Sequence, residues 1–200
     1  MQESLPRRSC LGHTLATYDR EHPERRRLER FIQRAFARHH GASVRAFMPT
    51  LLALEGQRGR VCGVVGFRKA AAEPLFLERY LDKPVELVLA EHVGDPVART
   101  HVVEVGNLAS LSCRAACHLV AALPRILLAE GNQWVVFTAT AAVRGMLAKF
   151  RAPVIELARA TRDRLDDGDD WGRYYDNDPR VIAGHLREGI APTFVELLSP

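Results

Sequence analysis

Two short apolar runs separated by a helix-length segment constrain the fold of this chain more than any other feature. The first run, HVVEVGNLAS, covers His101–Ser110, and the second, WVVFTAT, covers Trp134–Thr140. β-Branched and apolar residues dominate both runs, which is typical of strands covered on both faces of a sheet. The segment between them, residues 111–130, ends at Gly131 and Asn132. The spacing predicts two parallel strands joined by a crossover helix.

Polar residues interrupt these two runs at four positions, Glu104, Asn107, Thr138 and Thr140. Polar groups at the C-terminal ends of parallel strands are where α/β folds tend to bind ligands. We therefore expect a ligand site at the end of this strand pair.

The other segments predict a mixed sheet. Apolar residues at helical spacing predict a helix over residues 23–40, and a Gly-containing turn at residues 56–59 joins two runs into an antiparallel hairpin, 47–54 and 60–67. Further expected elements, in chain order, are a short helical piece over 74–81, an extended or mixed segment over 85–91, a helix over 141–150, a strand over 153–157, a helical turn over 181–186 and a strand over 191–198. The order predicts an α/β fold, an α+β three-layer arrangement, in which helices flank a mixed central sheet with an N-terminal antiparallel hairpin and a parallel centre.

The length of 200 residues suits one domain. We expect residues 1–22 to be an irregular segment and residues 23–200 to form the single domain. The opening MQESLPRRSC has no apolar signal-peptide core, and no run approaches the ~18 apolar residues of a membrane span. These patterns predict a cytoplasmic location.

Basic residues are concentrated near the N-terminus of a chain whose net charge is +4. The arginines of this region are Arg20, Arg25, Arg26, Arg27, Arg30, Arg34, Arg38 and Arg45. A solvated helix face explains them, and an anionic membrane surface or acidic ligand is the alternative. Nucleic acid is an unlikely partner because no aromatic residues for base stacking are interleaved. The four cysteines lack metal-ligand spacing, so we expect buried free thiols and no metal site.

Four separated stretches resemble the thermostable hemolysin family, and the resemblance runs from about residue 24 onward. They are PLFLERYLDKPVE (74–86), EVGNLAS (104–110), WVVFTAT (134–140) and WGRYYDNDP (171–179). The order of elements is separately similar to the GNAT-type N-acyltransferase fold, closest to its acyl-homoserine-lactone synthase branch. The family name implies lysis of red cells, whereas the fold implies transfer of an acyl group.

The fold resemblance implies where a substrate would bind. In such enzymes the two central strands splay apart and an acyl thioester lies in the gap. Here the backbone of Val105, Gly106 and Asn107 would bind it, because buried strand-edge groups need partners. Asn107, Thr138 and Thr140 either orient the substrate or satisfy backbone groups. The implied donor is an acyl-CoA or an acyl-carrier-protein thioester, and the implied acceptor is a small-molecule amine.

One stretch departs from the usual acyltransferase pattern. The glycine-rich loop that holds the CoA pyrophosphate with its amides is replaced by Asn107–Ser112, NLASLS, without a second glycine. A carrier-protein donor, another thioester, or a fold that has lost catalysis all fit this change.

Glu104 is the candidate general base, because burial among valines raises the pKa of a carboxylic acid toward neutrality. The alternative is a structural ion pair with Arg68 or Arg114. Tyr174 and Tyr175 are candidate acids for the leaving thiolate, and the alternative for both is packing.

The expected substrate-binding residues are Arg68, Glu78 and Arg79. Glu78 and Arg79 form either an ion pair that lines the cleft or a surface pair.

Two further functions remain open from sequence. In a membrane-active hemolysin, the arginine-rich helix would lie on an anionic surface with Leu28, Phe31 and Phe36 inserted. In a non-catalytic binding module, the same helix would bind nucleic acid or a carrier protein.

Overall fold

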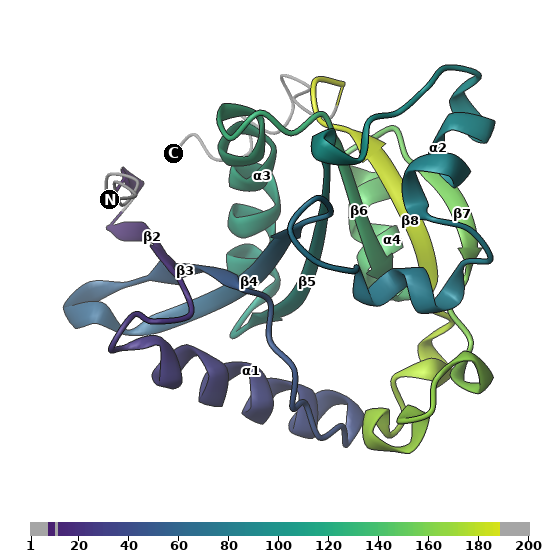
Figure 1. Ribbon diagram of the computed structural model, residues 1–200. Coiled ribbons are helices and arrows are strands. Elements are labelled where there is room, and N and C mark those ends of the chain that lie inside the picture. Colours follow the sequence, from purple (N-terminus) through teal and green to yellow (C-terminus); the bar gives the residue numbers. More distant parts are fainter. Residues whose placement is uncertain (1–7, 11, 189–200) are drawn as a thin grey trace.

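The computed structural model describes residues 8–10 and 12–188, and within them eight strands form one mixed sheet in the order β1-β2-β3-β4-β5-β6-β8-β7 (Figure 1). The strands are β1 (Arg8–Cys10), β2 (His13–Tyr18), β3 (Thr50–Glu55), β4 (Val61–Lys69), β5 (Val102–Ser110), β6 (Trp134–Ala139), β7 (Ile155–Arg159) and β8 (Arg180–His185). The helices are α1 (Arg25–His40), α2 (Val85–Val93), α3 (Cys113–Ala129) and α4 (Ala141–Lys149), and six 3₁₀ turns include η2 (Phe76–Tyr80). Strands β5 and β6 are parallel, and the other neighbours are antiparallel.

Helices cover both faces of the sheet, which gives the predicted three layers. Helix α1 packs on β2, β3 and β4, while η2 and α2 pack on the same face near β5, β6 and β8. Helices α3 and α4 cover the opposite face. Figure 1 shows α2 in front of the sheet and α4 behind it. Because side chains alternate between faces along a strand, Val102 faces the α2 layer and Val103 the α3 layer.

Helix α1 is fixed to the sheet by an apolar stripe and one buried arginine. Leu28 and Ile32 are fully buried, as their spacing of four residues predicts. The guanidinium of Arg25 donates to the carbonyl oxygens of Met48 at 2.6 Å and Pro49 at 2.7 Å. The helix ends at Gly41, whose φ of 66° is the left-handed conformation that glycine favours. The helix therefore holds residues 42–49 against the sheet.

Three expectations about secondary structure were wrong. Residues 13–18, expected to be irregular, form β2, because β3 offers them a full partner edge from Thr14 to Tyr18. Residues 85–93 form α2, where an extended or mixed segment over 85–91 was expected, and Gly94 (φ 77°) ends the helix. Residues 181–186 were expected to be a helical turn, but β8 lies between β6 and β7 and is buried by both.

Helix α3 runs without a break from Cys113 to Ala129 and contains Pro124. The expected strand over 191–198 lies outside the described residues. No helix in the described part of the chain is both long and apolar enough to cross a bilayer.

Candidate active site

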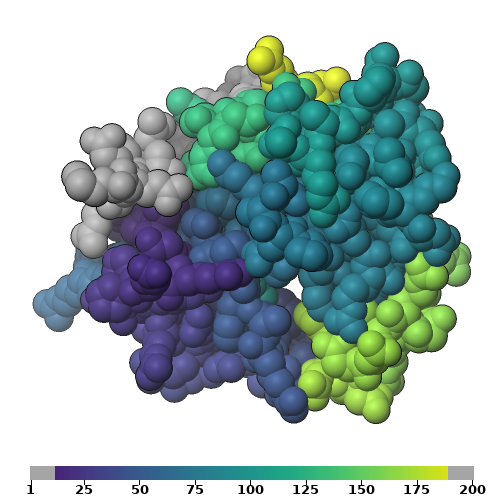
Figure 2. All heavy atoms as spheres, in the orientation of Figure 1, coloured from purple at the N-terminus to yellow at the C-terminus, as the bar shows by residue number. Residues whose placement is uncertain are grey.

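A cavity of about 470 Å³ opens where β5 and β6 diverge. The parallel pairing of the two strands ends at Val105 opposite Phe137. Beyond that point β5 continues beside β4 as far as Ser110, and β6 continues beside β8 as far as Ala139. Figure 2 shows the surface hollowed between the blue segment around residues 40–50 and the light-green segment around residues 165–178. The divergence therefore leaves a gap through the centre of the sheet.

Glu104 lies in the wall of this cavity with only 2% of its surface exposed. Its two carboxylate oxygens accept hydrogen bonds from the backbone N–H groups of Phe76 and Leu77, both at 2.9 Å. Arg68 Nε lies 3.3 Å from Oε2. Burial raises the pKa of Glu104 to about 6, although Arg68 and the two amides favour the charged form. The raised pKa expected of a base and the ion pair with Arg68 that was its alternative are therefore both present.

The two amides that hold Glu104 belong to η2, and Glu78 fixes that turn. Glu78 accepts from the backbone N–H groups of Leu75 and Val85, both at 3.0 Å, and forms two hydrogen bonds with Arg99, at 2.6 and 2.9 Å. Burial opposes ionisation, but Arg99 and the two amides lower the pKa of Glu78 to about 2. Glu78 therefore holds η2 in place, and with it the two backbone N–H groups that bind Glu104.

The expected Glu78–Arg79 pair does not form, because the two side chains have other partners. Glu78 pairs with Arg99, whereas Arg79 lies 2.9 Å from Asp167. Among the described residues, neither belongs to the wall of the cavity. Arg68 does line it.

The end of β5 is shaped by contacts with Met48. Asn107 has a φ of 52°, and its side-chain oxygen accepts from the backbone N–H of Met48 at 2.8 Å. A Cβ atom on Gly106 would lie 2.5 Å from Met48 Cε, and one on Gly66 would lie 2.5 Å from Met48 Cβ. Val105, Gly106 and Asn107 all line the cavity. The side chain of Asn107 is thus engaged in structure, while its backbone borders the gap.

Only one of the two candidate tyrosines borders the cavity. Tyr174 lines it, and its hydroxyl lies 3.5 Å from the carbonyl oxygen of Thr138. Burial raises the pKa of Tyr174 well above its usual value. Tyr175 is instead hydrogen-bonded to Tyr80 at 2.7 Å. Thr138 and Thr140 line the cavity from the β6 side.

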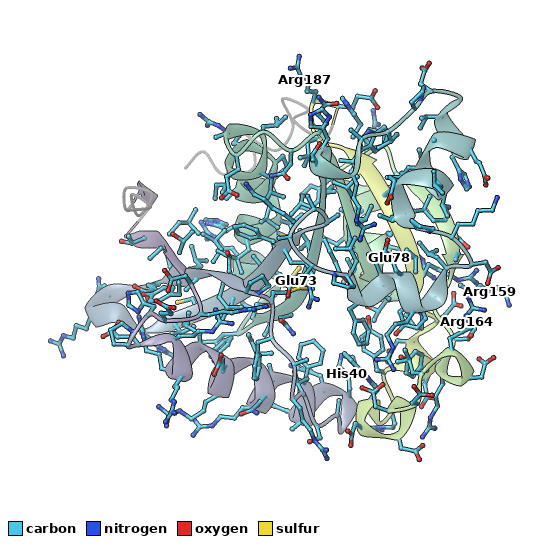
Figure 3. All side chains as sticks on the ribbon, viewed as in Figure 1. His40, Glu73, Glu78, Arg159, Arg164 and Arg187 are labelled. Carbon is cyan, nitrogen blue, oxygen red and sulfur yellow. The ribbon has the colours of Figure 1, made fainter. Side chains whose placement is uncertain are left out.

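The sequence analysis did not predict that aromatic side chains gather along one side of the cavity. Its rings include Phe36, His40, Phe76 and Trp171, and the ring of His40 lies 5.3 Å from that of Tyr174. Figure 3 shows His40 at the C-terminal end of α1, beside the light-green segment of residues 165–178. Burial is the main cause that lowers the pKa of His40. The WGRYY stretch signalled Trp171, but nothing local to α1 signalled His40.

Cys113 was expected to be buried, but it is exposed at the start of α3, with its sulfur 4.0 Å from that of Cys117. Among residues 8–10 and 12–188, no three His, Cys, Asp or Glu side chains gather as a metal site. The apolar face of α1, which a membrane-inserting helix would need, packs on the sheet through Leu28, Phe31 and Phe36.

Several solved structures share this fold. The AHL synthase LasI has 17% identity and a TM-score of 0.59, with coverage of 87% of this chain and 90% of that one. The CoA-dependent acyl-homoserine lactone synthase BjaI, with SAM and isopentyl-CoA, has 14% identity and a TM-score of 0.61, covering 94% and 88%. FeeM, an N-acyl amino acid synthase from uncultured soil microbes, has 15% identity and a TM-score of 0.59, covering 88% and 93%. Identities this low establish the fold alone, and the predicted GNAT-like fold is confirmed.

Sequence comparison gives the family directly. No curated protein matches this chain. Residues 18–190, however, match the model of the thermostable hemolysin family. That match spans most of the 200 residues, and the chain belongs to the thermostable hemolysin family.

Proposed function

We propose that this protein transfers an acyl group from a thioester donor to a small-molecule amine. The observation that carries the proposal is a buried carboxylate, Glu104, in the wall of a cavity that opens at an unpaired strand edge. Similar structures include synthases of acyl-homoserine lactones and of N-acyl amino acids, which supports acyl transfer as the reaction type.

The donor would lie along the diverging part of β5. No residue of β6 pairs with β5 beyond Val105. The backbone of Gly106 and Asn107 is therefore available for the amide groups of a pantetheine arm, since buried N–H and C=O groups require partners. Thr138 and Thr140 face the same gap from β6. The apolar side chains between α3 and α4, Leu123, Leu127 and Leu147 among them, would enclose the acyl chain.

The reaction needs one base for the amine. The amine nitrogen attacks the thioester carbonyl, the C–N bond forms, and Glu104 accepts the proton that the nitrogen loses. With its pKa near 6, Glu104 is largely a carboxylate at pH 7 to 8 and yet remains a usable base. The C–S bond then breaks and the donor leaves as a thiolate.

Tyr174 would stabilise that thiolate by a hydrogen bond. Because burial raises its pKa, the phenol stays protonated, and it holds its proton too tightly to give it up to a thiolate. Solvent then supplies the proton to the departing thiol. Tyr175, bonded to Tyr80, is assigned to packing.

Arg68 is the remaining candidate for contact with the acceptor. Its Nε lies near Glu104 and Met48 Sδ, and Nη1 donates to the carbonyl of Pro74 at 3.1 Å. Within the described residues, Nη2 has no hydrogen-bond partner. An acceptor with an anionic or carbonyl oxygen beside its amine would meet both Glu104 and Arg68.

The test is release of free thiol from octanoyl-CoA and octanoyl-pantetheine in the presence of separate amines, namely amino acids, homoserine lactone and polyamines. Mass spectrometry identifies the amide product. Glu104→Gln should slow product formation by about 10²- to 10⁴-fold. Glu73→Gln is the matched control, because Glu73 pairs with Arg20 at the surface. Equal rates for Glu104→Gln and wild type would remove Glu104 as the base. Failure of every thioester to bind or react would reject acyl transfer itself.

The membrane-active alternative is not favoured. The face of α1 that would insert is part of the hydrophobic core.

A further inference from the structure

Three sulfur atoms lie close together where α3 meets α4. Cys113 and Cys117 are one helical turn apart on α3, and their Sγ atoms are 4.0 Å apart. Met146 of α4 supplies the third sulfur, and its Sδ lies 3.8 Å from Cys117 Sγ. We call Cys113, Cys117 and Met146 the sulfur cluster. None of the three lines the cavity that contains Glu104, so the proposed acyl transfer leaves the cluster without a role.

Packing does not explain the position of Cys113. A free cysteine that serves the fold behaves as a small apolar residue and is usually buried. Cys113 is exposed and Cys117 is half-buried. Cys62 shows the ordinary behaviour, because it packs against the core cluster between the sheet and α3. An exposed thiol held beside a second thiol and a thioether is instead an arrangement of ligand atoms that solvent can reach.

The spacing of the three sulfurs fits a single bound metal ion. Bonds between a metal ion and thiolate sulfur are about 2.3 Å long. With two such bonds, a sulfur separation of 4.0 Å corresponds to an angle at the ion of about 120°. The separation of 3.8 Å between Cys117 and Met146 corresponds in the same way to about 110°. Both angles suit an ion with three sulfur ligands.

The ligand types select Cu(I) among the common ions. Thiolate and thioether sulfur are soft ligands that favour Cu(I). Structural zinc sites almost always use four ligands, drawn from Cys, His, Asp and Glu. Within the part of the chain that the structure describes, no third side chain of these types joins Cys113 and Cys117. A thioether in third place therefore fits Cu(I) better than Zn(II).

Charge and proton balance are simple for this ion. Binding replaces the two thiol protons of Cys113 and Cys117, which pass to solvent, and neither copper nor sulfur changes its oxidation state. Two thiolates, one neutral thioether and Cu(I) leave one net negative charge. The positive charge of Lys149, at the end of α4, acts on Cys117 and offsets it.

The two helices hold the sulfurs in place without help from a metal. Val120 of α3 packs against the apolar cluster that contains Leu147 of α4. The hydroxyl oxygen of Ser112 accepts from the backbone N–H of Ala115 at 3.2 Å and caps α3 beside Cys113. Arg144 donates to the carbonyl oxygen at the end of β6 at 3.1 Å, which fixes the first turns of α4. Ligands on such rigid elements are already arranged for binding.

An ion can reach the cluster from solvent. Cys113 is exposed, and Cys113 and Met146 both line a groove of about 260 Å³. The groove lies between the end of α1 and the first turns of α3 and α4. Its wall shares Phe36 and His40 with the wall of the larger cavity. The cluster thus lies beside the candidate active site while remaining separate from it.

We propose that Cys113, Cys117 and Met146 bind one Cu(I) ion between α3 and α4. The inference is independent of the proposed acyl transfer, because it uses no residue assigned to that reaction. Failure of one therefore leaves the other standing.

The test is a titration of the reduced, full-length protein with Cu(I) in the absence of air, against bicinchoninate as the competing chelator. Wild type should retain one equivalent of copper, and X-ray absorption should show three sulfur neighbours at about 2.3 Å. Cys113→Ser should weaken binding by about 100-fold. Met146→Leu keeps an apolar side chain of similar size and should weaken binding about tenfold, with two sulfur neighbours left. Cys62→Ser is the matched control and should stay within about twofold of wild type.

Thermal unfolding of the metal-free proteins keeps the comparison fair. Cys113→Ser changes an exposed side chain, so its melting temperature without copper should equal that of wild type. Added Cu(I) should raise the melting temperature of wild type and of Cys62→Ser, but not that of Cys113→Ser, because an ion that binds only the folded state stabilises it.

Three results would overturn the proposal. One is that wild type loses all its copper to bicinchoninate. Another is that Cys62→Ser weakens binding as much as Cys113→Ser does. The third is that Met146→Leu binds as tightly as wild type, because the thioether would then not be a ligand.

Discussion

Replacing Glu104 with glutamine removes a buried group whose pKa rises from its ordinary 4.5 to about 6 on folding. A rise of that size corresponds to about 2 kcal/mol between the two protonation states. Burial is the main cause, since only 2% of the residue is exposed. The substitution therefore changes how the unfolding free energy depends on pH, and this change can be measured without knowing the substrate.

The sign of the effect follows from proton binding. Below pH 4.5, Glu104 is protonated in both the folded and the unfolded chain. Between pH 4.5 and 6, the unfolded chain loses this proton while the folded protein keeps it, so the free energy of unfolding falls as pH rises. Above pH 6 the whole contribution of about 2 kcal/mol is lost. Between pH 5 and pH 8, the expected loss is about 1 kcal/mol.

Urea unfolding of wild type and Glu104→Gln at pH 5 and pH 8 measures this contribution. The stability of wild type relative to the variant should be lower at pH 8 than at pH 5 by about 1 kcal/mol. Glutamine also presents an N–H group to the backbone donors of Phe76 and Leu77, but that cost is the same at both pH values. Glu73→Gln removes a carboxylate at the surface and corrects for the loss of one charge. An identical difference at the two pH values would refute the raised pKa, and with it the argument for Glu104 as base.

Three further substitutions test the surroundings of Glu104. Gly106→Ala places a methyl group 2.5 Å from Met48 Cε and should destabilise the fold by about 1–3 kcal/mol in thermal unfolding; an unchanged melting temperature would show that Met48 moves aside freely. Arg99→Ala leaves Glu78 without its charged partner and should lower the free energy of unfolding by about 1–3 kcal/mol at pH 7. This loss should shrink as pH falls from 4.5 toward 2, because the partner lowers the pKa of Glu78 and the pair is lost when Glu78 is protonated. Urea unfolding that shows the same loss at pH 3 and at pH 7 would contradict this reasoning. Tyr174→Phe should slow thiol release by about 10²-fold while the free energy of unfolding stays as in wild type. An unaltered rate of thiol release would exclude the hydrogen bond from Tyr174 to the departing thiolate.

The centre of the fold was predictable because its signals are local. The apolar runs at residues 101–110 and 134–140 and the helix between them need no knowledge of distant residues. The position of Glu104 among valines also indicated burial, and burial is the leading cause of its raised pKa. The resemblance to a known fold supplied the divergence of the two strands, which their sequences alone did not predict.

Elements that depend on distant partners were the ones predicted wrongly. Residues 181–186 look like a short apolar turn in isolation, yet they form a strand because β6 and β7 pair with them on both sides. Residues 13–18 become β2 only because β3 offers an edge. The pairing of Glu78 with Arg99 joins residues 21 positions apart, so the adjacent Arg79 was the more obvious partner and the wrong one.

The cavity exists because β5 cannot follow β6 beyond Val105. A shift in register on β4 between Val64 and Gly66, together with the left-handed backbone of Asn107, turns the end of β5 away from β6. Met48 then packs where side chains on Gly66 and Gly106 would otherwise stand. The side chain of Asn107 is committed to Met48, and the Ser112 hydroxyl to the first turn of α3. Neither side chain is left to hold a phosphate, so the polar contacts of a donor within the gap would come from the backbone of Gly106 and Asn107.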